Sequence, residues 1–166
     1  AGAYVTLEHE YILIFRKGNK RIFKDAVSKK QRMESSFFWE ERNQWFSDLW
    51  DFKGTAQILK DKDLRGRSAA FPFELAYRLI NMYSLKNDLV FDPFLGTGTT
   101  SHAAAACGRN SIGIEIDENF SSTFFRDPGR IMQESNDRLR GRLAKHLEFI
   151  NDYQGRKGPV KYVNDH

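Results

Sequence analysis

The stretch from Leu89 to Gly108, LVFDPFLGTGTTSHAAAACG, constrains the fold of this 166-residue chain most strongly. An apolar run ends at an acid, Asp92, and a turn with glycines at 96 and 98 leads into a small-residue run. Such a pattern predicts a buried strand, a tight turn and a helix over 99–107 that Gly108 closes. Because glycines let a backbone approach a ligand closely, the turn is a candidate binding site.

The segments on either side of this unit extend the same pattern. FPFELAYRLINMYS, residues 71–84, has apolar residues at helical spacing and a proline at its start. SIGIEID, residues 111–117, predicts a second short buried strand that ends in acids. A helix–strand–turn–helix–strand series indicates an α/β fold in which a parallel sheet is connected by helical crossovers.

The residues at the two predicted strand ends restrict the classes of ligand that this turn could bind. Glu115 follows Asp92 at close to the roughly 20-residue spacing at which an acid meets ribose hydroxyls in nucleotide-binding folds. The dinucleotide fingerprint is incomplete, because Ser101 takes its third glycine position, and no lysine of a phosphate loop follows Gly98. Asp92 would repel a pyrophosphate and could hold a cationic amine. S-adenosylmethionine fits these features, while a nicotinamide cofactor and a purely structural turn remain alternatives.

Composition excludes several other classes of protein. With 40% hydrophobic and 14% aromatic residues, the chain is expected to form one globular domain. No apolar run is long enough for a membrane span and no signal segment is recognisable, so we expect a cytoplasmic protein. The single cysteine, Cys107, is expected to be a buried core thiol, and the four histidines share no ligand spacing, so no metal site is predicted.

The remaining segments have weaker patterns. Residues 10–18, EYILIFRKG, predict a strand followed by a basic turn. Residues 19–64 are irregular, mix Lys and Arg with aromatic side chains and contain all three tryptophans; within them, EERNQWFSDLWDF is compatible with a short helix or with a strand and turn. Residues 127–151 are charged with interspersed Leu and Ile, and predict one or two surface helices.

Residues 71–117 closely resemble the amino-methylating DNA methyltransferases, which make N4-methylcytosine or N6-methyladenine. The family pattern F-P-x-E-L, then D-P-F-x-G-[ST]-G-T-T, then G-R-x-x-I-G-x-E is matched in order. The resemblance implies a Rossmann-like S-adenosylmethionine-dependent fold, of which this chain holds a part. It places the cofactor at Phe71, Asp92, Pro93, Phe94, Gly96, Gly98, Thr99, Thr100 and Glu115.

Each of these residues also has a structural interpretation. Glu115 would hold the ribose hydroxyls, or be an ordinary solvated acid. Phe94 would line the cofactor, or be a core aromatic. Thr99 and Thr100 would offer helix N–H groups, or simply cap the helix. Phe71 would lie near the methionine end of the cofactor, or only anchor its own helix.

The order of the motifs resembles the permuted, β-type branch of this family. HEYILIFRKG looks like the family's late strand, which divides the chain into 1–18 (late strand), 19–64 (target-recognition segment), 65–126 (cofactor-binding half) and 127–166 (helical extension). The family's catalytic tetrapeptide, [DNS]-P-P-[YFW], would lie upstream of these segments. The chain contains no Pro-Pro pair, so no catalytic residue is assigned and the chain alone is expected to be inactive.

The resemblance implies that the whole enzyme methylates an exocyclic amine of double-stranded DNA in a restriction–modification system. A second chain, or an upstream half that carries the catalytic motif, would be a further partner. The alternative is a non-catalytic DNA- and cofactor-binding half of a split or truncated enzyme. Net charge is +4, and the basic residues between 16 and 32, opposed by the single acid Asp25, are the predicted phosphate contacts.

Overall fold

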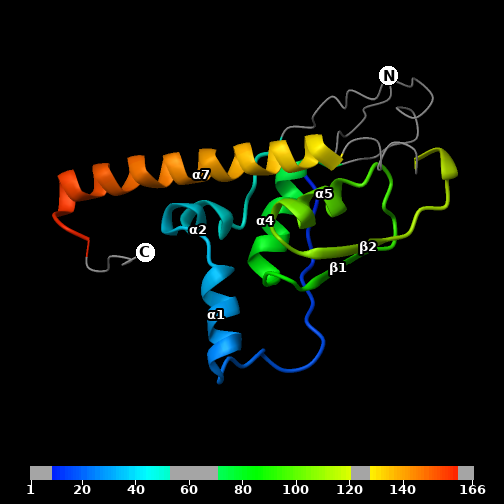
Figure 1. The fold of residues 1–166 in the computed structure, drawn as a ribbon, viewed down its shortest axis with the longest axis horizontal. Coiled ribbons are helices and arrows are strands. Elements are labelled where there is room, and N and C mark those ends of the chain that lie inside the picture. The colour runs from blue at the N-terminus through cyan, green and yellow to red at the C-terminus, as the bar shows by residue number, and fades with distance from the viewer. Residues whose placement is uncertain (1–8, 53–70, 121–127, 161–166) are drawn as a thin grey trace, which may run out of the picture.

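The computed structural model describes residues 9–52, 71–120 and 128–160. Two helices, α1 (Ala26–Glu34) and α2 (Trp39–Trp45), come first. They are followed by α4 (Phe73–Tyr83), β1 (Leu89–Asp92), α5 (Thr99–Ala106) and β2 (Asn110–Gly113), and then by the long α7 (Pro128–Lys157). In Figure 1, α7 crosses above α2 and α4, and the two strands lie beside α4 and α5.

The two described strands form a parallel pair connected by α5. Leu89 pairs with Asn110, and Asp92 at the other end pairs with Gly113. The connection from β1 through α5 to β2 is therefore the helical crossover that a parallel sheet requires. The predicted α/β fold with a parallel sheet is confirmed, and β1, α4 and α5 begin and end within two residues of the predicted positions.

The core lies where α4 packs on α5. Ala103 and Ala104 of α5 are fully buried, and their small side chains let α4 approach closely. Tyr77 and Ile80 of α4 fill this interface together with Trp45 of α2. Trp45 thus belongs to the main core. The segment around it, for which the sequence was compatible with a helix or a strand, forms helix α2 over residues 39–45.

Cys107 closes α5 inside the same core. Its thiol is 7% exposed and accepts a hydrogen bond from Asn81 Nδ2 at 3.0 Å. Burial raises the pKa of the Cys107 thiol to about 11. A neutral, buried thiol of this kind is a poor nucleophile, and the predicted core position of Cys107 is confirmed.

Arg109 fixes the junction between the helices and the second strand. Its guanidinium donates hydrogen bonds to Ser84 Oγ at 3.1 Å, to the Ser84 carbonyl at 2.8 Å and to the Cys107 carbonyl. The side chain is buried, and this burial lowers the pKa of Arg109. Arg109 therefore connects the end of α4 to the end of α5. Because β2 begins at the next residue, these bonds also hold the start of β2.

Helix α7 is a single helix of 30 residues, within the range of one or two helices that the sequence predicts. Arg142 donates to both carboxylate oxygens of Glu41 on α2, and Arg138 donates to Glu74 on α4 at 2.8 Å. His146 stacks on Phe38 with ring centroids 3.9 Å apart. Within the described residues, no helix has the length and apolar character needed to cross a membrane.

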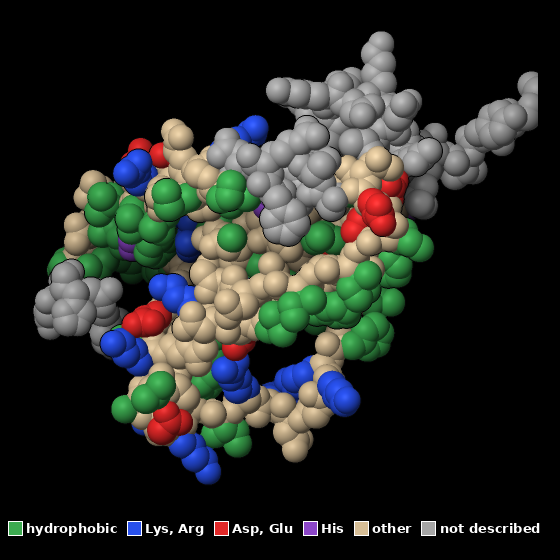
Figure 2. All heavy atoms as spheres, turned by 45° about the vertical axis from the view of Figure 1, so that its right-hand side comes forward, with side chains coloured by type: hydrophobic (Ala, Val, Ile, Leu, Met, Phe, Trp, Pro, Cys, Tyr) green, Lys and Arg blue, Asp and Glu red, His purple; other side chains and the backbone are tan. Residues whose placement is uncertain are grey.

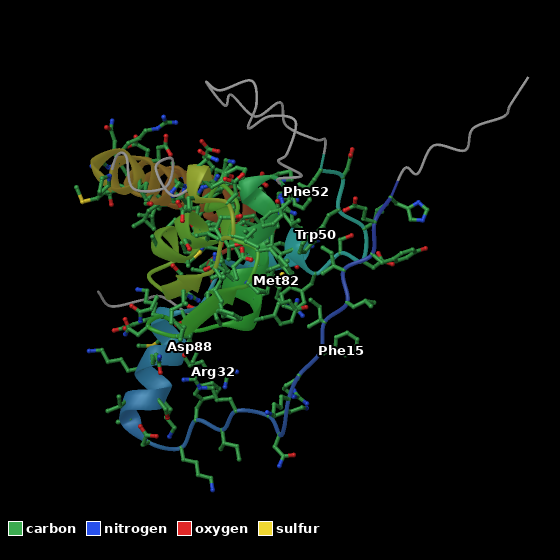
Figure 3. The ribbon with its side chains drawn as sticks, turned by 90° about the vertical axis from the view of Figure 1, so that its right-hand side faces the viewer. Phe15, Arg32, Trp50, Phe52, Met82 and Asp88 are labelled. Atoms are coloured by element: carbon green, nitrogen blue, oxygen red, sulfur yellow. The ribbon has the colours of Figure 1, made fainter. Side chains whose placement is uncertain are left out.

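The strand predicted over residues 10–18 does not form. Residues 10–18 form no regular element and pair with no described strand. Tyr11, Leu13 and Phe15 are 83%, 73% and 87% exposed, and Figure 3 shows Phe15 on a segment that stands apart from the core. The prediction was wrong because apolar, β-prone residues form a strand only where a neighbour satisfies their backbone groups.

Three further predictions need correction. The irregular region after residue 19 contains helix α1, whose N-cap Asp25 accepts a hydrogen bond from Ser28 N at 2.7 Å; residues 53–64 of that region lie outside the described residues. The second predicted strand ends at Gly113 rather than at residue 117, and Ile112, Ile114 and Ile116 are exposed instead of buried. The first strand is not buried either, because Leu89 and Phe91 are 60% and 57% exposed. No described element covers that side of the two-stranded sheet, and Figure 2 shows hydrophobic side chains at the surface there.

Candidate cofactor-binding site

The carboxyl ends of β1 and β2 lie side by side, because Asp92 pairs with Gly113. The residues that follow each strand, 93–98 and 114–117, therefore form two adjacent loops at one edge of the sheet. In open α/β sheets this edge is where ligands bind. All of the predicted site residues except Phe71 lie on these two loops, at the end of β1 or in the first turn of α5.

The first loop is built around two glycines in left-handed backbone conformations. Gly96 has φ of 52° and Gly98 has φ of 84°. Asp92 Oδ1 accepts a hydrogen bond from Phe94 N, and Gly98 N donates to the Leu95 carbonyl, both at 2.9 Å. The turn therefore requires glycine at both positions for conformational reasons alone, since other residues adopt such φ values at a cost.

Gly98 is also the N-cap of α5, so the loop leads directly into a helix N-terminus. Thr99 and Thr100 are the first two residues of that helix. The first backbone N–H groups of a helix have no partner within it and carry a partial positive charge. The arrangement can therefore donate hydrogen bonds to an acceptor on a bound ligand.

Glu115 joins the two loops. Its Oε2 accepts a hydrogen bond from Gly96 N at 2.6 Å, and its Oε1 accepts one from Asp117 N at 2.9 Å. Charge-assisted bonds of this kind are stronger than neutral ones. Glu115 is therefore more than an ordinary solvated acid, and each carboxylate oxygen retains a further lone pair for a ligand donor.

The remaining predicted site residues differ in exposure. Phe94 is 87% exposed, which contradicts the alternative that it is a core aromatic. Pro93 beside it is exposed as well, whereas Asp92 is half-buried. Phe71 is 40% exposed and lies two residues ahead of α4, outside the loops. The structure therefore brings Asp92, Phe94 and Glu115 to one edge, where Phe94 offers an open aromatic face.

Two grooves in the described structure run along α7 instead of at the strand ends. One, of about 410 Å³, lies between α5 and α7 and includes Ala106 and Leu139. The other, of about 630 Å³, includes Phe73 and Arg138. Neither groove is lined by residues of the two loops. Among the described residues, no cluster of His, Cys, Asp or Glu could hold a metal ion.

Sequence reasoning gave no role to Leu95 and Gly113, which meet at this edge of the sheet. Both fall within the motifs quoted above, but the motifs alone do not show that they are in contact. The available signal was Gly113, because a glycine inside a strand often marks a close approach of another group. In the structure that group is the Leu95 side chain.

A parallel β–α–β unit with a glycine turn after its first strand and an acid after its second defines a Rossmann-like nucleotide-binding architecture. A family model for DNA methylases, N6_N4_Mtase, matches residues 1–126. The chain belongs to this DNA methylase family.

Individual relatives agree with this assignment. The chain is 57% identical over 155 residues to type II methyltransferase M.MthZI of Methanothermobacter thermautotrophicus, which covers 93% of this chain and 44% of the relative. It is 50% identical over 117 residues to type II methyltransferase M.MjaI of Methanocaldococcus jannaschii, covering 70% of this chain and 37% of the relative.

A solved structure extends the likeness to the fold. The crystal structure of a protein assigned as a DNA modification methylase from Thermus thermophilus, complexed with S-adenosyl-L-methionine, superposes with a TM-score of 0.62 at 34% identity. The match covers 78% of this chain and 47% of that protein. The Rossmann-like methyltransferase fold is confirmed, and the chain spans less than half the length of these relatives.

Proposed function

We propose that this chain is the cofactor-binding part of an S-adenosylmethionine-dependent DNA methyltransferase. The whole protein would methylate an exocyclic amine, cytosine N4 or adenine N6, in double-stranded DNA as part of a cytoplasmic restriction–modification system. The observation that carries the proposal is the 2.6 Å hydrogen bond between Gly96 N and Glu115 Oε2, which joins two loops at the carboxyl ends of adjacent parallel strands. The type II methyltransferase relatives and the S-adenosyl-L-methionine complex of the Thermus protein support it.

The residues at this edge fit such a cofactor. Asp92 at the end of β1 and Glu115, two residues after β2, disfavour a pyrophosphate and suit a ligand with ribose hydroxyls and an ammonium group. Glu115 has acceptor capacity left for the hydroxyls, and Asp92 Oδ2 accepts no hydrogen bond from the described residues. Phe94 offers an exposed ring for the adenine.

The neighbouring predicted residues have lesser roles in this proposal. Thr99 and Thr100 present the helix N–H groups of α5, and Pro93 holds the backbone that leads into the turn. Phe71, partly exposed ahead of α4, would contact the methionine end of the cofactor.

When bound, S-adenosylmethionine supplies a methyl group that the sulfonium charge makes electrophilic. The task of this chain's residues is to hold the cofactor in one orientation, because alignment of two reactants lowers the barrier substantially. A base in duplex DNA is reached by flipping it out of the stack. Its amine would be held by a Pro-Pro tetrapeptide, which is absent from these 166 residues and would come from another segment or chain.

The DNA-facing side of the proposal rests on lysines before and within α1. Lys17, Lys20, Lys24 and Lys29 are exposed and form no ion pair with the described residues. Figure 2 shows Lys and Arg side chains gathered on this part of the molecule. Cations of this kind contact phosphates and position the duplex without reading its sequence.

A second candidate function is a non-catalytic half of a split enzyme, which binds the cofactor and DNA. The absence of a Pro-Pro pair favours it. Both functions predict the same result when the chain is incubated with tritiated S-adenosylmethionine and duplex DNA. We expect no label in the DNA from this chain alone. Sequence-specific incorporation would show that the chain is itself a complete enzyme and would contradict both assignments of its role.

Calorimetry tests the proposed cofactor. The chain is expected to bind S-adenosylhomocysteine at one site and to give no binding heat with NAD⁺, since the dinucleotide fingerprint is incomplete. Glu148→Ala, an exposed acid on α7, serves as a control that should bind like the wild type. Failure of the wild-type chain to bind S-adenosylhomocysteine, or equal binding of NAD⁺, would overturn the proposal.

A further inference from the structure

The loop that follows β1 meets the end of β2 at one contact that involves neither a predicted ligand residue nor a charged group. A Cβ atom added at Gly113 would lie 2.5 Å from Leu95 Cδ1, 2.8 Å from Cδ2 and 2.9 Å from Cγ. These separations are far below van der Waals contact, so the Leu95 side chain occupies the space that any larger residue at 113 would need. Leu95 is half-buried in this position.

The backbone around this contact is bonded on both sides. Leu95 N donates a hydrogen bond to the Ile114 carbonyl, and Ile114 N donates to the Asp92 carbonyl, both at 2.9 Å. Leu95 is therefore held against the end of β2 by its main chain and by its side chain together. Two of the residues next to this contact are ligand candidates, since Gly96 follows Leu95 and Glu115 lies two residues after Gly113.

We propose that Leu95 and Gly113 are positioning residues, whose contact sets the relative placement of the two cofactor loops. The contact fixes the distance over which Gly96 N reaches Glu115, and it also fixes the start of α5, because Gly98 N donates to the Leu95 carbonyl. Displacing Leu95 would disturb both links at once. This inference rests on the proposed function, because cofactor affinity is one of its two readouts.

The need for glycine at 113 is steric. Gly113 is not among the glycines with positive φ, so its backbone conformation is open to alanine. The effect of Gly113→Ala must then come from the clash with Leu95. Shortening Leu95 to alanine removes the three clashing atoms, and the double variant Leu95→Ala/Gly113→Ala should restore the loop geometry.

The test compares wild type, Gly113→Ala, Leu95→Ala and the double variant by calorimetry with S-adenosylhomocysteine. Gly113→Ala is expected to bind about tenfold more weakly, and the double variant to return to within about threefold of Leu95→Ala. Gly141→Ala is the matched control, because an added Cβ on that α7 glycine meets nothing within 4 Å. Wild-type affinity in Gly113→Ala, or a double variant no better than Gly113→Ala, would overturn the proposal.

A second readout is independent of the cofactor. The Gly96 amide proton, bonded to a carboxylate at 2.6 Å, should resonate downfield in ligand-free wild type, move upfield in Gly113→Ala and return in the double variant. An unmoved Gly96 resonance would contradict the proposal even if affinity changed. If wild type fails to bind S-adenosylhomocysteine, the proposed function fails while the Gly96 resonance still decides this inference. If Gly113→Ala does not fold, the double variant should recover the fold, and failure to do so is contrary evidence.

Discussion

Two apolar stretches of this chain, Leu89–Asp92 and Tyr11–Phe15, differ in what lies beside them. The first is β1, whose backbone pairs with β2 and whose Val90 packs against the core. The second has a longer apolar run, yet Tyr11 and Phe15 are more than four-fifths exposed and no strand forms. The difference teaches that β-prone composition becomes a strand only when a neighbouring strand and a covering helix are available.

The charged residues of the two regions differ in the same way. In the part built on α4, α5 and α7, two arginines connect different elements: Arg109 binds Ser84 and Arg142 binds Glu41. In the region that leads into α1, most cations face outward, and Arg21 is the exception because it binds Asp88 at 2.8 Å. Figure 3 labels Asp88, which accepts this bond where the region meets the folded unit. Exposed cations are accessible to a charged partner such as DNA, whereas buried arginines stabilise the packing of the helices.

The largest expected effect is on the free energy of unfolding, which a substitution in the core should change far more than one in residues 11–15. Tyr77 of α4 is 3% exposed and packs edge-on against Trp45, with ring centroids 6.1 Å apart. Tyr77→Ala is expected to lower the free energy of unfolding by about 3–5 kcal/mol through lost burial and a cavity. Phe15→Ala should change it by less than about 0.5 kcal/mol. Urea denaturation measures both.

Tyr77→Leu provides a milder variant if Tyr77→Ala fails to fold, and it should fall between Tyr77→Ala and wild type. A loss of stability in Phe15→Ala comparable to that in Tyr77→Ala would mean that residues 11–15 are packed in solution, and the comparison would fail.

The next prediction tests, through the pH dependence of stability, whether the α4–α5 core excludes water from Cys107. The folded pKa of Cys107 is raised to about 11 from an ordinary value of 9.0. Between these values the folded state holds a proton that the unfolded state has released, so the stability that Cys107 contributes is complete below about pH 9 and is lost as pH rises. The free energy of unfolding of wild type relative to Cys107→Ala should fall by about 2–3 kcal/mol from pH 8 to pH 11. A difference that stays constant with pH would mean that the thiol is not sealed.

A smaller effect concerns the loops at the strand ends. Glu115→Ala removes the acceptor of Gly96 N and is expected to weaken S-adenosylhomocysteine binding by about 1–3 kcal/mol. Glu115→Gln keeps one oxygen acceptor and should lose less. Calorimetry gives the affinities, melting curves check folding, and Glu148→Ala is the control. Unchanged affinity in both Glu115 variants would leave Glu115 with no part in binding.

The smallest effect per residue is expected from the outward cations. Replacing Lys20, Lys24 and Lys29 by alanine should reduce the slope of log affinity against log salt by about 0.9 for each phosphate contact removed. Affinity should fall about equally on two unrelated duplexes, because phosphate contacts carry no sequence information. Fluorescence anisotropy in a salt titration measures this, with Lys145→Ala on α7 as the control. A slope equal to that of wild type would remove the DNA role from this region.

How far the sequence alone predicts this molecule depends on whether the determinants are local. The turn at Gly96 and Gly98 and helix α5 are predicted closely, because glycine and alanine impose their conformations on the few residues around them. The prediction of a strand over residues 10–18 is wrong because pairing is a property of the neighbours, which composition does not reveal. Ile112 was expected to be buried and is 52% exposed, because none of the described elements packs on its side of the sheet.

The candidate site shows the same limit. Asp92 and Glu115 are identified by their spacing along the chain, and the structure places both at one edge. Two interactions join residues nearly twenty positions apart: the hydrogen bond from Gly96 N to Glu115 and the contact of Leu95 with Gly113. Only the pairing of β1 with β2 brings these residues together. Motif matching therefore finds the residues, while the structure supplies the way in which they support one another.

The central claim is that the loops after β1 and β2 form the cofactor site. Backbone amide shifts of the ¹⁵N-labelled chain, recorded while S-adenosylhomocysteine is added, test it most directly. The account predicts that the largest shifts occur at Gly96, Gly98, Thr99 and Glu115, while the amides along the outer half of α7 stay in place. Shifts concentrated instead in the grooves along α7, with Gly96 and Glu115 unmoved, would contradict it.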